Sequence, residues 1–209
     1  MKKLTILLIA AVFIAGCATE TTNIDVQNDT AGAVMGLDYR DFEKAASSMV
    51  QSMVQSGSIN KPGGGRYVMA TSRIINDTMQ YIDTDQLMAK IEEELLNTGK
   101  IVFTSAVSGR KEGVKGESGG STDVLIEQSR DLRESDEFNQ GNVAAKGQLI
   151  APELSIAGKI IQKNVTIKKN VQQVEYYFQL YVTDLTTGLR LWQREEFIGK
   201  RGSNKSVSW

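Results

Sequence analysis

The sequence predicts a layered α+β domain in which helices pack on a mainly antiparallel sheet. Three observations lead to this fold class. Apolar residues recur at three- and four-residue intervals in the first half of the chain, and they alternate with polar residues in the last third. Hydrophobic residues make up 41% of the 209 residues, which is enough to fill one core. Helical segments before a strand-rich half are typical of α+β proteins.

Two amphipathic helices are expected first. Asp38 is the expected N-cap of a helix that ends at Ser56, before Gly57, with an apolar row of Phe42, Ala45, Ala46, Met49 and Met53. Asp83 begins the second helix, which ends at Gly99 and buries Leu87, Ile91 and Leu95. The methionine stripe could form an adaptable binding groove, but helical spacing favours core packing.

Strands are predicted at Tyr67–Ile75 and Ile101–Phe103, where β-branched and aromatic residues follow a break in the chain. The glycine-rich residues 107–121 are predicted to form a loop, and Thr122–Glu137 a third, mostly polar helix. From Leu154 onward the apolar residues alternate, with a tight turn at Asp184–Gly188. An antiparallel meander is therefore expected, and Lys200–Trp209 is interpreted as a basic tail.

The N-terminus has the pattern of a secretion signal. Lys2 and Lys3 precede an apolar run, Leu4–Ile14, whose helix would rise about 16 Å, too little to span a bilayer. Ile14–Cys17 (IAGC) resembles a bacterial lipobox. That resemblance implies a signal peptide over residues 1–16, a lipidated Cys17 in a flexible tether over 17–37, and a globular domain over 38–209. The alternative is an ordinary signal peptide with a free cysteine.

The residue after the cysteine indicates the destination of such a lipoprotein. It is Ala18, and not the aspartate that favours retention in the inner membrane in many proteins of this kind. We therefore expect the protein in the outer membrane, facing the periplasm.

The composition excludes several kinds of chemistry. The chain has no histidine and one cysteine, which excludes His-based acid/base catalysis and His/Cys metal sites. Glu92, Glu93 and Glu94 point in three directions from a helix, so they are interpreted as a solvated face. Lysine and arginine number 24 against 25 acids, which argues against nucleic acid as a partner. We expect no enzyme activity, no catalytic residues, no metal and no cofactor.

Three stretches resemble the LpoB family of outer-membrane lipoproteins that activate penicillin-binding proteins. They are Ile74–Phe103, Leu149–Asn164 and Val174–Trp209. Asn76, Thr78, Asp83, Thr84 and Gly99 occur in family order, followed by the hairpin residues Asp184, Thr187, Gly188 and Trp192. Together with the lipobox, the resemblance covers nearly the whole mature chain.

This resemblance implies a sheet flanked by helices, similar to the N-terminal domain of TolB. It also implies binding to the regulatory domain of a class A penicillin-binding protein, whose peptidoglycan synthesis is then stimulated. The family's docking surface includes the segment that matches the third helix, so Gln128, Arg130, Arg133 and Asp136 are the expected partner-binding residues. Solvated pairs, such as Arg130 with Glu134, are the alternative for these side chains. The tether departs from the long, proline-rich tether of known relatives, because Ala18–Gly36 is short and has no proline.

Two other functions stay open. A basic stripe that includes Lys159, Lys163, Lys168, Lys169, Lys200, Arg201 and Lys205 could bind peptidoglycan or another anionic partner, although lysines on an edge strand also block aggregation. A secretion-associated lipoprotein similar to CsgG would need membrane-forming strands, and residues 107–121 are too polar for one.

Overall fold

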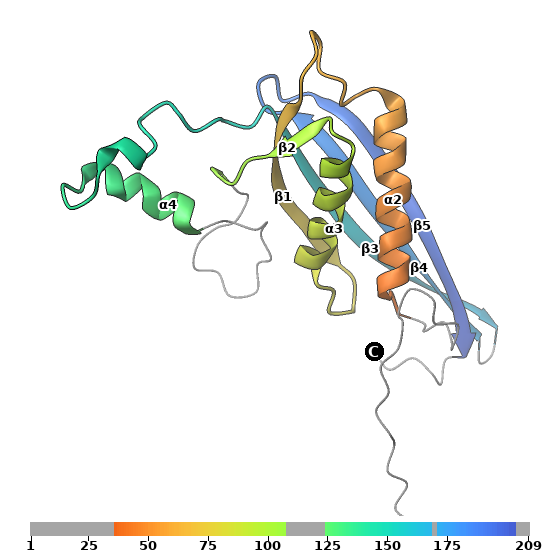
Figure 1. The fold of residues 1–209 in the computed structure, drawn as a ribbon. Coiled ribbons are helices and arrows are strands. Elements are labelled where there is room, and N and C mark those ends of the chain that lie inside the picture. The colour runs from red at the N-terminus through yellow and green to blue at the C-terminus, as the bar shows by residue number, and fades with distance from the viewer. Residues whose placement is uncertain (1–35, 108–123, 169–170, 204–209) are drawn as a thin grey trace, which may run out of the picture. The chain divides into compact units, whose positions relative to one another are not determined.

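Five strands form one mixed sheet in the computed structural model, which describes residues 36–107, 124–168 and 171–203 (Figure 1). The order of the strands across the sheet is β2-β1-β3-β4-β5. Their bounds are Tyr67–Asp77 (β1), Ile101–Phe103 (β2), Leu154–Lys168 (β3), Val171–Asp184 (β4) and Arg190–Ser203 (β5). The described residues all belong to one unit of the chain, Ala33–Trp209.

The last three strands form the expected meander, since β3 pairs antiparallel with β4 and β4 with β5 along most of their lengths. β1 is parallel to both β2 and β3. Parallel neighbours need a crossover connection, and the second helix provides it between β1 and β2. The predicted fold class, helices on a mainly antiparallel sheet, is confirmed, and the parallel pairs are the feature that residue patterns did not reveal.

Helix α2 spans Tyr39–Ser56 and begins where the sequence predicts. The Asp38 carboxylate accepts a hydrogen bond from the Asp41 backbone N–H at 3.1 Å, and the Asp38 N–H donates to Asp41 Oδ2 at 3.0 Å. This reciprocal capping satisfies backbone donors that the first turn leaves free. Gly57 ends the helix with a φ of 74°, a conformation that glycine adopts without strain.

Helix α3 spans Thr84–Asn97. Asp83 caps it by accepting from the backbone N–H groups of Asp85 and Gln86 at 3.1 and 3.0 Å. Both helices cover the same face of the sheet (Figure 1). Met49, Met53 and Ile91 of these helices are fully buried in one cluster with inward-facing residues of the strands, and Phe42 packs against this cluster partly buried. The methionines of α2 are therefore core residues, as helical spacing indicated.

Two predicted elements need correction. The third helix was expected over Thr122–Glu137, but the described part of α4 covers only Val124–Asp131, followed by the short 3-10 helices η1 (Leu132–Glu134) and η2 (Gln140–Asn142). After Asp131 the sequence has too few apolar residues to give a helix a buried face. Residues 200–203, interpreted as the start of a tail, instead extend β5, because β4 offers them backbone partners down to Val171.

Candidate functional site

The four predicted partner-binding residues lie within one short segment that begins at α4. Gln128 and Arg130 are on α4, with side chains outside the described part of the structure. Arg133 is in η1, and its Nε donates a hydrogen bond to the carbonyl oxygen of Ala144 at 2.5 Å. Asp136 follows η1 and is exposed. Arg133 and Asp136 are therefore neighbours in the sequence, and the bond of Arg133 to Ala144 fixes the turn of this segment.

Several side-chain contacts join parts of this segment to one another. The side-chain amide of Gln140 donates to the carbonyl oxygens of Leu132, Ser135 and Phe138 at 3.0, 2.7 and 3.2 Å. Glu134 forms an exposed ion pair with Lys146 at 3.6 Å. An exposed pair of this kind contributes little stability, so both charges can interact with another molecule.

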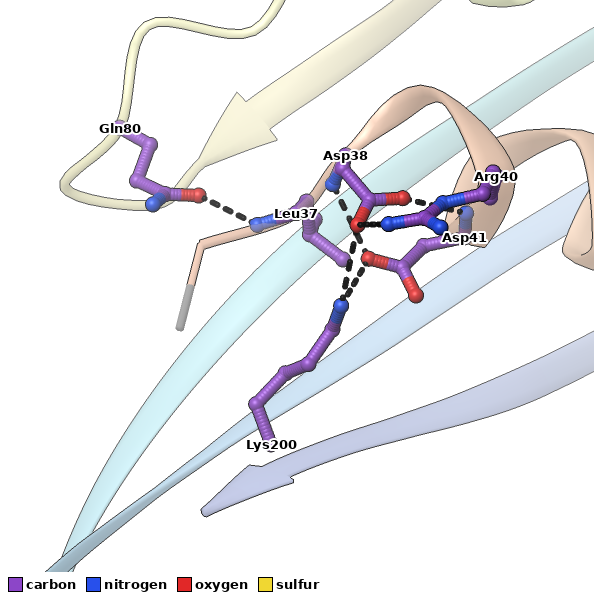
Figure 2. Close-up of polar contacts among 6 residues, drawn as sticks. All are labelled: Leu37, Asp38, Arg40, Asp41, Gln80 and Lys200. Atoms are coloured by element: carbon purple, nitrogen blue, oxygen red, sulfur yellow. Dashed lines mark hydrogen bonds and ion pairs between the residues drawn. The ribbon is translucent and has the colours of Figure 1, made fainter. Parts of the chain in front are cut away.

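A second group of polar side chains joins the start of the domain to its sheet (Figure 2). Lys200 reaches from β5 to the first turn of α2, where its Nζ lies 2.6 Å from Asp41 Oδ2 and 3.5 Å from Asp38 Oδ2. Arg40 adds a contact to Asp38 at 3.4 Å. The backbone N–H of Leu37 donates to Gln80 Oε1 at 3.1 Å, so the loop between β1 and α3 belongs to the same junction.

The charges of this junction determine the protonation of Asp38. Burial alone would raise the pKa of Asp38, but the Asp41 backbone N–H and the positive charges of Lys200 and Arg40 together hold it below its usual value. Asp38 therefore stays ionised at neutral pH, and it caps α2 as a carboxylate.

A groove opens between the first turns of α2 and α3. We call it the α2–α3 groove. Leu37, Phe42 and Leu87 contribute apolar side chains to its lining, and Asp38, Glu43 and Asp83 contribute carboxylates, with Lys90 as the base. It encloses about 120 Å³, which is below the roughly 300 Å³ at which small-molecule sites begin. Its size therefore suits a single side chain.

The loop between β1 and α3 exposes two large apolar side chains. Tyr81 is 97% exposed and Met79 is 66% exposed. Asn76 Nδ2 donates to the carbonyl oxygen of Gln80 at 2.8 Å, and Thr78 Oγ1 donates to Asn76 Oδ1 at 2.7 Å. Asn76 and Thr78, which the sequence singled out by their family order, therefore build this loop.

The three glutamates of α3 are not all exposed to solvent. This corrects the prediction that Glu92, Glu93 and Glu94 form a solvated face. Glu93 is exposed, but Glu92 and Glu94 are half-buried. Burial raises the pKa of Glu92, and a hydrogen bond from Thr71 opposes this rise. Ser47 of α2 donates to Glu94 at 2.5 Å, so Glu94 ties the two helices together. The period of a helix alone could not show that a second helix would cover this side.

Lys169 and Lys205 of the predicted basic stripe lie outside the described residues, and Lys159 and Lys200 lie on opposite faces of the sheet. Lys200 points to the helix-covered face, where it meets Asp38 and Asp41. Lys159 alternates with the core residue Ile160, so it lies on the opposite face, and it pairs with Asp77 at 2.7 Å. Sequence reasoning missed Lys200 as a junction residue, although the alternation through Ile198 could have placed it in the strand.

The described residues hold no group of three or more acidic, histidine or cysteine side chains arranged to bind a metal ion. No helix in residues 36–107, 124–168 and 171–203 is long and apolar enough to cross a membrane. The predicted lipidation site, Cys17, lies outside these residues, as do the signal peptide, most of the tether, nearly all of the glycine-rich loop and residues 204–209.

The sequence profile of the family described as peptidoglycan-synthase activator LpoB matches residues 41–198. The chain therefore belongs to the LpoB family. No curated protein matches the sequence.

Several solved structures are similar to this chain at low sequence identity, two of them LpoB domains. The C-terminal domain of LpoB from Salmonella enterica is 12% identical with a TM-score of 0.41, and the match covers 76% of this chain and 98% of that domain. The corresponding domain from Escherichia coli is 13% identical with the same TM-score and coverage. The lipoprotein GNA1162 from Neisseria meningitidis is 9% identical with a TM-score of 0.36, over 68% of this chain and 87% of its own.

Proposed function

We propose that this protein is an outer-membrane lipoprotein that faces the periplasm and that binds and stimulates a class A penicillin-binding protein. The observation that carries the proposal is the match to the peptidoglycan-synthase activator family over residues 41–198, which contains nearly all of every helix and most of every strand of the described domain. In this proposal the chain acts as a non-catalytic regulator, and the polymerisation and crosslinking of glycan strands take place in the partner.

The proposed anchor follows from the N-terminal sequence. Residues 1–16 act as the signal peptide, Cys17 carries the lipid, and residues 17–37 tether the domain of residues 38–209. Each buried methylene of an acyl chain contributes about 0.8 kcal/mol, so several chains on Cys17 give lasting attachment. The 19 residues of Ala18–Gly36 reach about 24 Å on average as a flexible coil, and at most about 65 Å. The partner must therefore approach the outer membrane within this range.

The docking surface is proposed at Gln128, Arg130, Arg133 and Asp136. The exposure of Asp136 and the exposed ion pair of Glu134 with Lys146 support this assignment, because charges at the rim of an interface steer association and fix its register. The proposed docking residues include two arginines and one aspartate. They therefore suit a partner surface that carries both acidic and basic side chains.

Binding to the regulatory domain of the host's class A synthase tests the proposal directly. We expect Arg130→Glu in the full-length lipoprotein to weaken binding about tenfold, because like charges then face each other in the interface. Arg66→Glu is the matched control, since Arg66 is exposed in the turn before β1 and should bind like the unchanged protein. Isothermal titration gives both affinities. Equal affinity for the two variants would remove the α4 segment from the interface, and no binding by the unchanged protein would contradict the proposed function.

A further inference from the structure

We propose that the α2–α3 groove and the loop of Met79 and Tyr81 form a second docking surface, which receives an apolar side chain next to lysine or arginine from a segment of the synthase. The inference rests on the proposed function only in the choice of the synthase as the partner. The chemistry of the partner segment follows from the groove itself.

The shape of the groove fits one inserted side chain. Its apolar lining residues, Leu37, Phe42 and Leu87, come from the chain before α2 and from both helices. A volume of about 120 Å³ holds a side chain of a protein partner but is too small for a typical free ligand. Apolar anchors buried in pockets of this kind contribute most of the affinity in many interfaces.

The charge at the groove favours a basic partner. Three carboxylates, those of Asp38, Glu43 and Asp83, line it against the single ammonium group of Lys90. Lys90 Nζ lies 3.3 Å from Glu93, which does not line the groove, and 3.8 Å from Glu43, which does. The positive charge of Lys90 is therefore shared with a residue outside the groove. Asp38 is already paired with Lys200 and Arg40, so the excess negative charge of the lining comes from Glu43 and Asp83. Complementary charge attracts a partner and fixes its orientation.

The loop beside the groove offers a preorganised aromatic contact. In the sequence, Tyr81 stands between Gln80 and Asp83. Gln80 accepts a hydrogen bond from the Leu37 N–H, and Asp83 lines the groove. Figure 2 shows Gln80 reaching to Leu37 at the start of α2. The bonds from Asn76 and Thr78 hold the loop, and Met79 N donates to Gln162 Oε1 at 3.1 Å. Because the backbone is already fixed, binding through Tyr81 loses little conformational entropy.

Two variants of the full-length lipoprotein test this surface, with the regulatory domain of the host's class A synthase as the probe. Tyr81→Ala removes the aromatic contact, and Glu43→Lys replaces one of the groove's acids with a base. We expect each to weaken binding about tenfold or more.

Leu189→Ala is the control for Tyr81, because Leu189 is 62% exposed beside the turn before β5. Glu195→Lys is the control for Glu43, since it makes the same charge reversal at an exposed residue of β5 that bonds to Gln179 of β4 and does not line the groove. Both controls should bind within twofold of the unchanged protein.

The outcomes separate this inference from the proposed function. If the unchanged protein binds the synthase and Tyr81→Ala or Glu43→Lys binds equally well, the second docking surface is wrong while the proposed function stands. Equal losses in the control variants would also overturn it. If the unchanged protein does not bind at all, the proposed function fails and the choice of partner fails with it. Self-association that Tyr81→Ala abolishes would assign the surface to a second copy and overturn the inference.

Discussion

Lys200 extends from β5 toward the first turn of α2, where its ammonium group meets two carboxylates (Figure 2). Its side chain is only 11% exposed, so this is a partly buried charge cluster and not a surface ion pair. Charges removed from water need partners, and a cluster that loses one partner is destabilised more than an exposed pair would be. The first turn of α2 is therefore stabilised by Lys200, a residue about 160 positions further along the chain.

Replacing this lysine should destabilise the domain. We expect Lys200→Ala to lower the free energy of unfolding by about 1–3 kcal/mol, because Asp38 and Asp41 then face each other without a shared cation. Arg201→Ala is the matched control, since Arg201 is exposed and its guanidinium group donates to Gln173 Oε1 on the neighbouring strand. That variant should change the free energy by less than about 0.5 kcal/mol. Urea denaturation measures both, and equal values for the two variants would contradict the prediction.

The lowered pKa of Asp38 predicts how stability depends on pH. A carboxylate whose folded pKa lies below its ordinary value of 3.8 stabilises the fold fully above that value, and this contribution is lost as the pH falls through the folded pKa. Asp38→Asn keeps a good N-cap but removes the titrating group. We expect the unchanged protein to lose more stability than Asp38→Asn below about pH 4, in denaturation curves recorded at several pH values. Parallel pH profiles would show that Asp38 does not contribute.

At the scale of elements, β1 and β4 pack closely on either side of Gly158 on β3. A Cβ atom at this position would lie 2.6 Å from the backbone oxygen of Gln179 and 2.8 Å from Leu180 Cδ2. Gly158 pairs with Ile74 of β1 on one side and Leu180 of β4 on the other, at the point where the parallel and antiparallel parts of the sheet join. A missing side chain here permits close contact between the strands.

A side chain at this position should disrupt the centre of the sheet. We expect Gly158→Val to lower the free energy of unfolding by at least about 2 kcal/mol, since the backbone of β4 cannot move aside without breaking its pairing. Thr166→Val on the exposed end of the same strand should stay within about 0.5 kcal/mol of the unchanged protein. Thermal unfolding followed by circular dichroism distinguishes them. A Gly158→Val protein as stable as Thr166→Val would show that the strands can separate here at little cost.

For the whole molecule, the proposed anchor and the domain have separate tasks. In the proposed function the anchor determines where the domain is, and the domain determines what it binds. A regulator of this kind needs both in cells, whereas we expect the domain's affinity for its partner in solution to be the same with and without the lipid. The two tasks can therefore be separated by changing the N-terminal cysteine alone.

We expect Cys17→Ser to lose metabolic palmitate label and to leave the membrane fraction, while the purified variant keeps its affinity for the synthase. Because the variant no longer stays at the membrane, its stimulation of peptidoglycan synthesis in cells should also fall. Ala18→Asp is the control: it should keep the label but move to the inner membrane, as an aspartate after the cysteine implies for many such proteins. Palmitate label on the Cys17→Ser protein would show that the anchor lies elsewhere.

Residue patterns determined the local structure of this protein. The caps Asp38 and Asp83, the turn at Asp184–Gly188 and the alternation in β4 all depend on neighbours within a few residues, and the structure confirms each of them. The family order of short motifs indicated the family, which the match over residues 41–198 shows.

Only the tertiary structure decided the rest, because it depends on residues far apart in the chain. The parallel pairing of β1 with β3, the contact of Lys200 with α2 and the meeting of Gln80 with Leu37 each join segments separated by more than 40 residues. A sequence pattern reports which face of an element is apolar, but not which element will cover it. The exposure of Tyr81 and the partial burial of Glu92 follow from that covering, so they could not be inferred from period or composition.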